Sequence, residues 1–406
     1  MKIKTDIVVV GAGPAGSTTA ISAARNGGEV LILDRKQNIG IPVQCGEAIG
    51  KVGPGIAEIN VPEDSIRNPI RGFRVYSPNL LKVEYVKPEP DGYIVDRRVF
   101  DKELLAKATE EGANVLVDTD VTGLIWEHGI VKGVIARSMG EQVEVKADIV
   151  IGADGINSTI ARLTGLRKFF KLKDLDASVG YEMTGVKIDD PDLMEFYMGR
   201  EVAPRGYVWI FPKGDDRANV GIGVGGGYGE KIALEYLQSF IKNHELGKEK
   251  LGSAKIIEFR VGAIPVGGPN EKNVVDNVML VGDAAGQVHP ITGGGIGYAM
   301  VCGSIAGRVA VECITEGDTS EKALMKYELS WQDKYGEEFV KMLELRKLLE
   351  ETDDKTLDKL GEVLSGKNIV DLTAGKKVSI LFRGLAKRSK KLLKLLNAFR
   401  TLKLIQ

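Results

Sequence analysis

Cysteine and histidine are scarce in this chain of 406 residues. Its 3 cysteines, Cys45, Cys302 and Cys313, include no CxxC pair. This excludes a disulfide framework, a zinc ribbon and a cysteine-ligated iron–sulfur cluster. With only 3 histidines, a multi-histidine metal site is also disfavoured. We therefore expect no bound metal.

Net charge and long apolar runs are lacking as well. A formal net charge of −1 argues against nucleic acid as a partner. No uncharged apolar run reaches the ~18 residues that predict a membrane-spanning helix. Residues 1–4 imitate the start of a signal peptide, but Asp6 interrupts the pattern and the apolar run over 7–10 is too short. The sequence predicts a cytoplasmic protein.

Charge is unevenly distributed along the chain. Residues 372–406 contain 10 Lys or Arg and no Asp or Glu, which leaves 45 basic and 56 acidic residues in the rest. The leucines of this tail are spaced largely as on one face of a helix. A basic amphipathic helix of this kind suits peripheral contact with an anionic membrane. The alternative is an ordinary C-terminal helix packed on the acidic body, and the sequence leaves both interpretations open.

Glycine is in excess, with 50 residues of 406. No collagen-like period accompanies it, so glycine serves tight turns and close backbone approaches. At about 150 residues per domain, the length predicts two to three domains. Such a chain buries a core without metal or disulfide support.

The first 35 residues have the pattern of a strand–helix–strand unit in a parallel sheet. A buried-strand pattern over residues 6–10 leads into a glycine turn at 11–16. A helix over 17–25 and a second strand over 29–33 follow.

The glycine turn carries the dinucleotide motif G-x-G-x-x-G. Gly11 allows the tight turn, Gly13 lets backbone approach a pyrophosphate, and Gly16 lets the helix pack on the strand. Asp34 ends the second strand, where a carboxylate binds ribose hydroxyls. Because a carboxylate disfavours a 2′-phosphate, the motif predicts FAD or NAD rather than NADP.

A later segment decides between these two dinucleotides. A strand over 278–281 delivers Asp283 to a sheet edge, where an aspartate suits the ribityl chain that NAD lacks. The alternative role of Asp283 is a helix N-cap, which is compatible with the first. Residues 290–296 then open a helix whose free N–H groups suit the flavin pyrimidine. The two roles considered for His289 are polarisation of a group near the flavin and a structural role, and the structural role is favoured.

A second G-x-G-x-x-G occurs at residues 221–226. No strand ending in an acidic residue follows it at the required distance. We interpret this segment as a hinge or cavity-lining turn and propose no second dinucleotide site.

The predicted fold class is α/β. A Rossmann-like FAD-binding domain is assembled from separated segments, an antiparallel-sheet substrate domain is inserted between them, and a helical C-terminal region follows. The FAD-binding domain is predicted over residues 1–70, 97–165 and 270–315. The substrate domain is predicted over 71–96 and 166–269, and the helical region over 316–406.

Three aromatic residues alternate along one predicted strand. Tyr207, Trp209 and Phe211 therefore point to one face of the sheet. A stripe of this spacing is more often ordinary core. The alternative is an aromatic wall that faces a flavin and suits a long, purely apolar polyisoprenoid.

Several segments together resemble the para-hydroxybenzoate hydroxylase superfamily of flavoproteins. These are the glycine loop with Asp34, the segments D-R-R-V-F-D at 96–101 and A-D-G at 153–155, and G-D-A-A-G at 282–286. Two more resemble the geranylgeranyl reductases: P-V-Q-C-G-E-A at 42–48 and P-R-G-Y-V-W-I-F-P-K-G at 204–214. One departure is Ala48, where the family usually has glycine.

The resemblance implies roles for individual residues. Residues implied to contact FAD are Ala15, Gly16, Asp34, Cys45, Gly46, Ala48, Arg97, Val121, Asp283, Gly295 and Ile296, besides Gly11 and Gly13 of the motif. The family signature also favours the aromatic stripe as a substrate wall.

The resemblance further implies an FAD-dependent oxidoreductase acting on CH–CH groups, which saturates geranylgeranyl chains of archaeal-type ether lipids or their precursors. An isolated alkene does not stabilise a carbanion, so hydride transfer must be accompanied by protonation in a dry site. Cys45 and Tyr207 are candidate catalytic residues, and the electron donor is NAD(P)H or a reduced ferredoxin-like protein. Rival functions are a flavin monooxygenase, a prenyl-quinone reductase, and a non-catalytic prenyl carrier resembling the Rab dissociation inhibitors.

Overall fold

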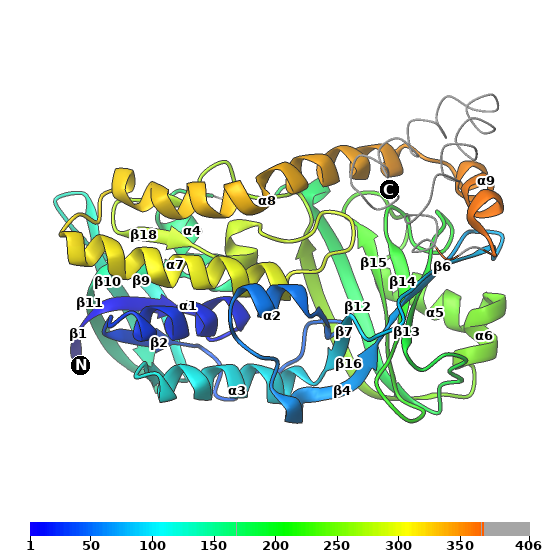
Figure 1. The fold of residues 1–406 in the computed structure, drawn as a ribbon, viewed down its shortest axis with the longest axis horizontal. Coiled ribbons are helices and arrows are strands. Elements are labelled where there is room, and N and C mark those ends of the chain that lie inside the picture. Colours follow the sequence, from blue (N-terminus) through cyan, green and yellow to red (C-terminus); the bar gives the residue numbers. More distant parts are fainter. Residues whose placement is uncertain (168, 367, 369–406) are drawn as a thin grey trace.

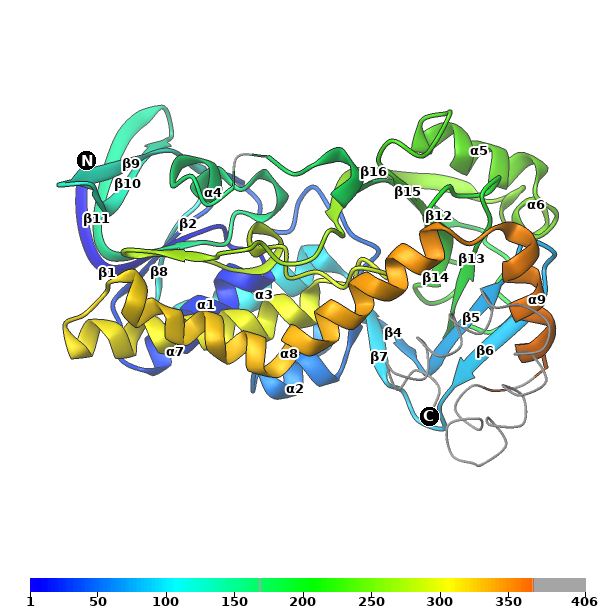
Figure 2. The same cartoon turned by 90° about the horizontal axis from the view of Figure 1, so that it is seen from above.

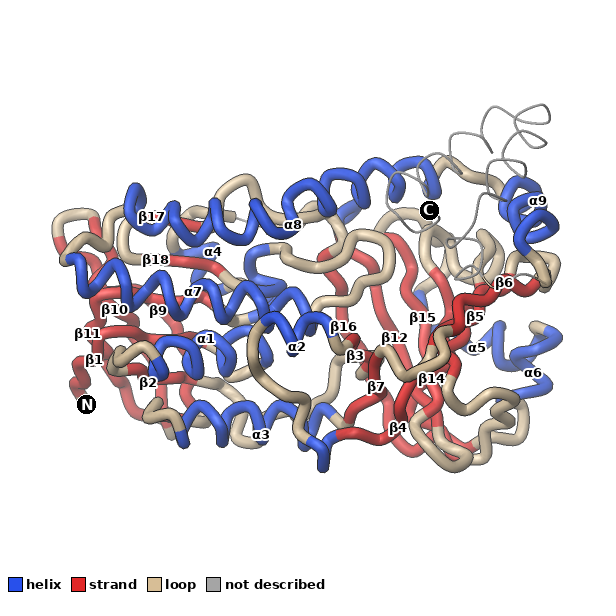
Figure 3. The backbone as a smooth tube through the Cα atoms, viewed as in Figure 1, coloured by secondary structure: helices blue, strands red, loops and turns tan. Residues whose placement is uncertain are grey.

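The structure is a computed structural model that describes residues 1–167, 169–366 and 368. Two bodies lie side by side along the long axis of the molecule, each built on its own large β-sheet (Figure 1, Figure 3). The N-terminus lies at the far end of the first body. The predicted tail helix over 372–406 lies outside the described residues.

The first body contains an eight-stranded sheet with a parallel centre in the order β17-β18-β11-β1-β2-β8. The hairpin strands β9 and β10 continue from β11. The strands are β1 Lys2–Val10, β2 Val30–Leu33, β8 Asn114–Leu116, β9 Thr119–Glu127, β10 Ile130–Ser138, β11 Glu141–Gly152, β17 Val274–Val275 and β18 Val278–Leu280. The predicted Rossmann-like unit is confirmed.

Helices α1 Pro14–Arg25, α3 Arg97–Glu110 and α7 Ile296–Glu316 belong to this body, and α1 packs closely along α7. Glycines of α7 permit this approach, because a Cβ on Gly303 would lie 2.6 Å from the carbonyl O of Ala15. Asp96 caps α3 by accepting a hydrogen bond from the Arg98 N–H. Short helices are α2 Val52–Ile56 and α4 Thr159–Leu163.

Helix α7 is the one helix, among the described residues, that is long and apolar enough to span a membrane. Of its most apolar window, 61% is buried inside the protein. An apolar helix of this kind is also typical of a protein core.

The second body contains a seven-stranded sheet in the order β16-β12-β15-β14-β13-β5-β6. Its pairs are antiparallel except β13 with β5, which run parallel. The strands are β5 Gly72–Tyr76, β6 Lys82–Val86, β12 Leu175–Thr184, β13 Leu193–Tyr197, β14 Tyr207–Pro212, β15 Ala218–Gly225 and β16 Lys255–Pro265. Helices α5 Ala233–Asn243 and α6 Glu245–Leu251 lie on this side of the molecule, and buried residues of both belong to the apolar core of this sheet.

A three-stranded sheet joins the two bodies. It pairs β3 Ala48–Gly50 and β4 Ile66–Ile70 with β7 Gly92–Val95. The predicted domain boundaries placed β7 with the substrate domain, apart from β3 and β4. The structure unites the three strands because β7 bonds to both neighbours.

Helix α8 Glu321–Glu350 runs from the first body to the second, where α9 Asp354–Leu364 follows (Figure 2). Ser320 caps α8 by accepting a hydrogen bond from the Ala323 N–H. The helix packs on α7 and on β17, so it ties the second body to the core of the first. The predicted helical character of the C-terminal region is confirmed over α8 and α9.

The interpretation of residues 221–226 as a hinge or cavity-lining turn is wrong. Gly221 and Gly223 lie inside β15, with strands paired on both sides. A Cβ on Gly221 would lie 2.2 Å from Cζ2 of Trp209. The glycine therefore makes room for the neighbouring indole ring within a continuous strand.

Candidate active site

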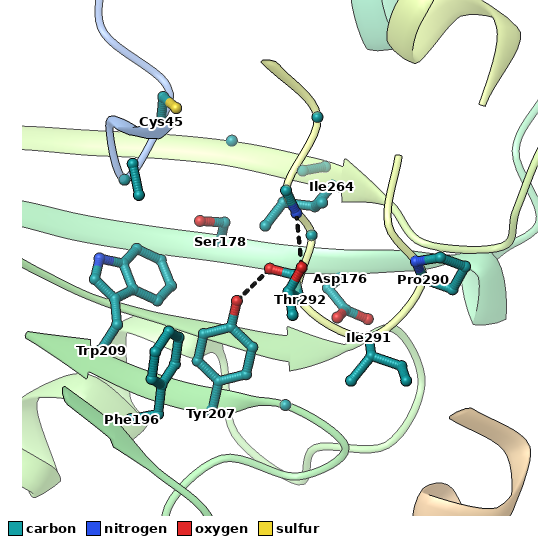
Figure 4. A pocket seen from close by; sticks show the side chains of 18 of the residues that line it. Cys45, Asp176, Ser178, Phe196, Tyr207, Trp209, Ile264, Pro290, Ile291 and Thr292 are labelled. Carbon is teal, nitrogen blue, oxygen red and sulfur yellow. Dashed lines mark hydrogen bonds between the residues drawn. The ribbon is translucent and has the colours of Figure 1, made fainter. Parts of the chain in front are cut away.

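One large cavity, of about 680 Å³, lies between the two bodies. Figure 4 shows part of it from close by, with the aromatic rings of β13 and β14 below the Cys45 loop. Both bodies line it, and most of the predicted site residues meet there. Those that line it are Gly13, Ala15, Cys45, Gly46, Ala48, Arg97, Tyr207, Trp209, Phe211, Asp283, Gly295 and Ile296.

The glycine loop forms a cradle at one end of this cavity. A Cβ on Gly11 would lie 2.4 Å from the carbonyl O of Ala153, and one on Gly16 would lie 1.8 Å from the carbonyl O of Gly11. A Cβ on Gly13 would meet no protein atom within 4 Å. Since Gly13 lines the cavity and begins helix α1, the loop offers open space at a positive helix end. This fits a pyrophosphate.

Asp34 supports the loop from behind. Its Oδ2 accepts a hydrogen bond of 2.7 Å from the Ala12 N–H, and its Oδ1 accepts one of 2.8 Å from the Lys36 N–H. Asp34 does not line the main cavity, and neither does Val121, which is buried in β9. Gly11 and Gly16 also lie behind the lining and shape it through the backbone.

Arg97 interacts with two other predicted site residues, Cys45 and Asp283, and with Asp101. Its guanidinium donates to both carboxylate oxygens of Asp101, at 2.7 and 2.8 Å. Burial alone would lower the pKa of Arg97, but Asp101 and the Cys45 side chain raise it. The same charge opposes the effect of burial, which raises the pKa of Asp283. Arg97 therefore supplies a buried cation in the cavity wall that interacts electrostatically with Cys45 and Asp283.

Asp283 and the start of α7 form the opposite side of the cradle. The described part of the chain donates no hydrogen bond to the Asp283 carboxylate, which leaves this acceptor free for a ligand hydroxyl. Gly295 is the N-cap of α7 and has no side chain that could accept a hydrogen bond from the first N–H groups of the helix. His289 lies outside the cavity lining, where its Nδ1 accepts hydrogen bonds from the N–H groups of Ile291 and Thr292. Burial lowers its pKa to about 4, in agreement with a structural role.

The aromatic stripe faces the cavity. Tyr207, Trp209 and Phe211 stand side by side on β14, with ring centroids 6.1 and 6.0 Å apart. Phe196 of β13, which the sequence analysis missed, contacts Tyr207 and Phe211 edge-on at 5.1 and 5.3 Å. We call these four residues the aromatic wall. They belong to a small cluster that is separate from the main core of their sheet.

Tyr207 also fastens the aromatic wall to the first body. Its hydroxyl donates a hydrogen bond to the carbonyl O of Thr292, in the segment that leads into α7 (Figure 4). Burial raises the pKa of Tyr207 above its ordinary value. At neutral pH this hydroxyl is therefore protonated.

A buried group of charges lies under the Cys45–Glu47 turn, and the sequence analysis did not identify it. Glu47 Oε2 lies 2.6 Å from Lys213 Nζ and 2.9 Å from Arg260 Nη1. Glu182 Oε2 lies 2.8 and 2.7 Å from the same two cations. We call Glu47, Glu182, Lys213 and Arg260 the buried ion cluster. Two carboxylates and two cations balance there, as buried charges require.

The buried ion cluster fixes the turn that carries Cys45. Arg260 donates to the carbonyl O of Cys45 at 3.2 Å, and Asn219 donates to that of Gly46 at 3.1 Å. Glu47 itself has a φ of +67°, which a non-glycine residue rarely adopts. Burial alone would raise the pKa of Glu47, but Arg260 and Lys213 lower it. The ionised carboxylate therefore holds the turn in shape.

A sequence signal for this cluster existed. Lys213 continues the alternation of Tyr207, Trp209 and Phe211, so the strand pattern already points it to the same side of the sheet. A lysine at the end of an apolar stripe requires a partner when it is buried. No local pattern, however, identifies that partner as Glu47, 166 positions earlier.

Comparisons with known proteins agree with this geometry. Residues 6–167 match the family model of FAD dependent oxidoreductases, and residues 174–264 match that of the geranylgeranyl reductase catalytic domain. Digeranylgeranylglycerophospholipid reductase of Methanocaldococcus jannaschii is 46% identical over 361 residues, covering 88% of this chain and 90% of the relative. Digeranylgeranylglycerophospholipid reductase 2 of Methanopyrus kandleri is 41% identical over 390 residues, covering 96% and 98%. The chain belongs to the digeranylgeranylglycerophospholipid reductase family.

Solved structures place the fold in the same group. A geranylgeranyl bacteriochlorophyll reductase-like protein of Thermoplasma acidophilum superposes with a TM-score of 0.89 at 33% identity, covering 99% of this chain and 100% of that one. A flavin-dependent brominase, at 20% identity and a TM-score of 0.70, covers 95% of this chain and 98% of its own and shares the fold. The predicted fold class and the resemblance to geranylgeranyl reductases are confirmed.

The cofactor of this digeranylgeranylglycerophospholipid reductase family member is FAD. The residues present fit it, because the open space at Gly13, the uncapped start of α7 and the free Asp283 carboxylate all face one cavity. The dinucleotide would be held by the glycine loop, Arg97 and Asp283. The Cys45 turn and the first residues of α7 would enclose its flavin end.

Proposed function

We propose that this protein is an FAD-dependent reductase that saturates the C=C bonds of geranylgeranyl chains in ether glycerophospholipids or their precursors. The observation that carries the proposal is the shared cavity. A cradle for a dinucleotide and an aromatic wall line the same space. An isoprenoid chain has no polar handle, so contact with an extended apolar wall is the recognition available to it.

When bound and reduced, FAD supplies the hydride for this reaction. The protein's own residues position the lipid and exclude water. Trp209, Phe211 and Phe196 offer apolar surface beside the Cys45 turn, since a Cβ on Gly46 would lie 3.0 Å from Cε2 of Phe211. A dry wall prevents water from capturing a cation-like alkene.

The proton that accompanies the hydride is assigned to one of two groups. Tyr207 is protonated and lines the cavity, with its hydroxyl bonded to the Thr292 carbonyl O. Cys45 also lines the cavity, and its Sγ accepts a hydrogen bond of 3.2 Å from the Glu47 N–H. Both lie on elements that the rest of the structure fixes, so either is a candidate donor for a positioned alkene.

The electron donor and the location of the protein are further parts of the proposal. NAD(P)H or a reduced ferredoxin-like protein is the proposed source of electrons. Residues 221–225 of the second glycine motif lie inside β15, so the motif gives no support to a separate nucleotide site. We place the protein in the cytoplasm, in peripheral contact with the membrane that holds its substrate.

The test is mass spectrometry of a digeranylgeranyl ether phospholipid after incubation with the FAD-loaded protein and dithionite. Saturation adds one H₂ for each double bond, and this is the expected product. Addition of oxygen in the presence of NAD(P)H and O₂ would indicate a monooxygenase instead. Tight lipid binding by a colourless protein that takes up no FAD would indicate a carrier.

A further inference from the structure

An apolar surface is exposed on the segment that connects α4 to β12. Phe169 is 80% exposed and Leu172 is 66% exposed. The turn that carries Tyr228, which is 50% exposed, packs against Leu172, since a Cβ on the adjacent Gly227 would lie 3.7 Å from Cδ2 of Leu172. We call Phe169, Leu172 and Tyr228 the apolar patch. Grouped large apolar side chains at such exposure mark an interaction surface.

The sequence around the apolar patch is basic. Between Asp154 and Asp174 the chain has no acidic residue. Its basic residues there are Arg162, Arg167, Lys168, Lys171 and Lys173. Of these, Lys171 and Lys173 are exposed beside Leu172. Arg167 is used internally, where it donates to Asn270 Oδ1 at 2.7 Å and covers the Phe170 ring.

The same segment is fastened to the wall of the lipid cavity. Arg205 Nη1 donates to the carbonyl O of Lys173 at 2.5 Å, and Arg346 Nη2 donates to it at 3.3 Å. Both arginines line the cavity. In Figure 2 the segment passes from α4 in the first body to the second sheet along one side of the molecule. The carbonyl of Lys173, next to Leu172, is therefore held by two residues of the cavity wall.

We propose that the apolar patch, with Lys171 and Lys173, docks this protein on an anionic lipid bilayer. Phe169 and Leu172 enter the boundary between head groups and acyl chains, and the two lysines meet lipid phosphates. This inference rests on the proposed function, because a glycerophospholipid substrate resides in such a bilayer. An acidic redox protein would also meet the lysines, but it gives no reason for the exposed apolar side chains of Phe169 and Leu172.

Depth of insertion is measured with a tryptophan reporter in the full-length, FAD-loaded protein. Phe169→Trp is compared with Met139→Trp, because Met139 is also 80% exposed but lies at the turn between β10 and β11. The vesicles contain equal parts of phosphatidylcholine and phosphatidylglycerol, with acyl chains brominated to quench tryptophan. Quenching of the Phe169→Trp variant beyond that of the Met139→Trp variant is expected. Vesicle binding without this difference would overturn the proposal, since docking would then occur elsewhere.

Affinity is measured by co-sedimentation with unbrominated vesicles of the same composition. Replacing Phe169 and Leu172 by serine is expected to weaken binding roughly tenfold or more, whereas Met139→Ser leaves it unchanged. Lys171→Gln with Lys173→Gln weakens binding at low salt and has less effect at high salt. Equal binding of all variants would overturn the proposal. So would variants that lose electron transfer from a soluble acidic protein while they keep vesicle binding.

These outcomes are separable from failure of the proposed function. Vesicle binding and tryptophan quenching need no turnover, so they stand or fall without the reaction. Turnover of detergent-dispersed lipid by the Phe169→Ser, Leu172→Ser variant is expected to equal that of the unmodified protein. A loss of flavin content or of detergent-phase turnover in that variant would show that the patch supports the fold, against the proposal.

Discussion

The FAD side of the cavity is shaped mainly by glycines, whereas the second sheet is shaped by buried side chains that attract one another. At Gly11 and Gly16 the protein removes side chains so that backbone meets backbone. Across the cavity, Lys213 and Arg260 neutralise Glu47 and Glu182 beneath the Cys45 turn. A phosphate-bearing dinucleotide is bound by exposed N–H groups. An isoprenoid chain has no polar group to which the protein could donate a hydrogen bond. The aromatic wall that contacts the chain must therefore be held rigid by the residues packed behind it.

The largest effect is expected when the buried ion cluster, which supports the Cys45 turn, is disrupted. Lys213→Met is expected to cost about 3–5 kcal/mol in the free energy of unfolding, because it leaves Glu47 and Glu182 buried with fewer partners. Urea unfolding followed by flavin fluorescence measures this. The matched control is Lys326→Met on the surface, where Lys326 lies 2.8 Å from Glu312 and is 40% exposed. That change is expected to cost less than about 1 kcal/mol, and similar losses for the two variants would contradict the assignment.

Removing one ring of the aromatic wall tests whether these residues position the lipid in the cavity or only stabilise the hydrophobic core. Trp209→Ala is expected to slow reduction of geranylgeranyl chains roughly a hundredfold through misplacement of the lipid, with flavin content retained. Phe240→Ala serves as the control, since Phe240 belongs to the main core of the same body. It is expected to cost about 3–5 kcal/mol in stability without any preference for chain length. A Trp209→Ala protein that is unstable yet reduces all chain lengths normally would make the aromatic wall ordinary core.

Gly13 and Gly16 lie in the same loop, but Gly16 is required for backbone packing whereas Gly13 leaves space for the ligand. Gly16→Ala places a Cβ 1.8 Å from the Gly11 carbonyl O and is expected to destabilise even the FAD-free protein by about 1–3 kcal/mol. Gly13→Ala meets no protein atom within 4 Å. It is expected to change the stability of the FAD-free protein by less than about 1 kcal/mol and to weaken FAD binding. Calorimetric melting of both variants with and without FAD measures this, and equal melting of the two FAD-free variants would refute the distinction.

The smallest expected effect is the pH dependence contributed by Asp96. Burial would raise the pKa of this carboxyl, but Arg98 and Lys213 lower it from 3.8 to about 2. A carboxyl whose pKa is lowered in the folded state adds stability above its unfolded pKa, and that stability is lost as the pH falls. Asp96→Asn keeps an N-cap for α3 and removes the charge.

We therefore expect Asp96→Asn to cost at most about 2 kcal/mol at pH 7. The difference from the unmodified protein should shrink as the pH falls from about 4 toward about 2. Unfolding by urea across this pH range provides the measurement. A difference that stays constant with pH would assign the effect to packing rather than to the carboxylate charge.

Local patterns predicted the first body well. The strand, glycine loop and helix of residues 2–25 are contiguous, and the tight approach of Gly16 to the carbonyl O of Gly11 involves near neighbours in sequence. Asp34 was found because its place at the end of β2 is fixed by the same unit. The aromatic stripe was also visible, because alternation on a strand is a local property.

The sequence alone determined the dinucleotide cradle, the alternation of Tyr207, Trp209 and Phe211, and the scarcity of metal ligands. Only the tertiary structure decided that Gly221 leaves room for Trp209 and that Lys213 pairs with Glu47, 166 positions away. The physical reason is the range of the interactions. Turns and strand faces follow from adjacent residues, whereas the partner of a buried charge is set by which distant strands the packing brings together.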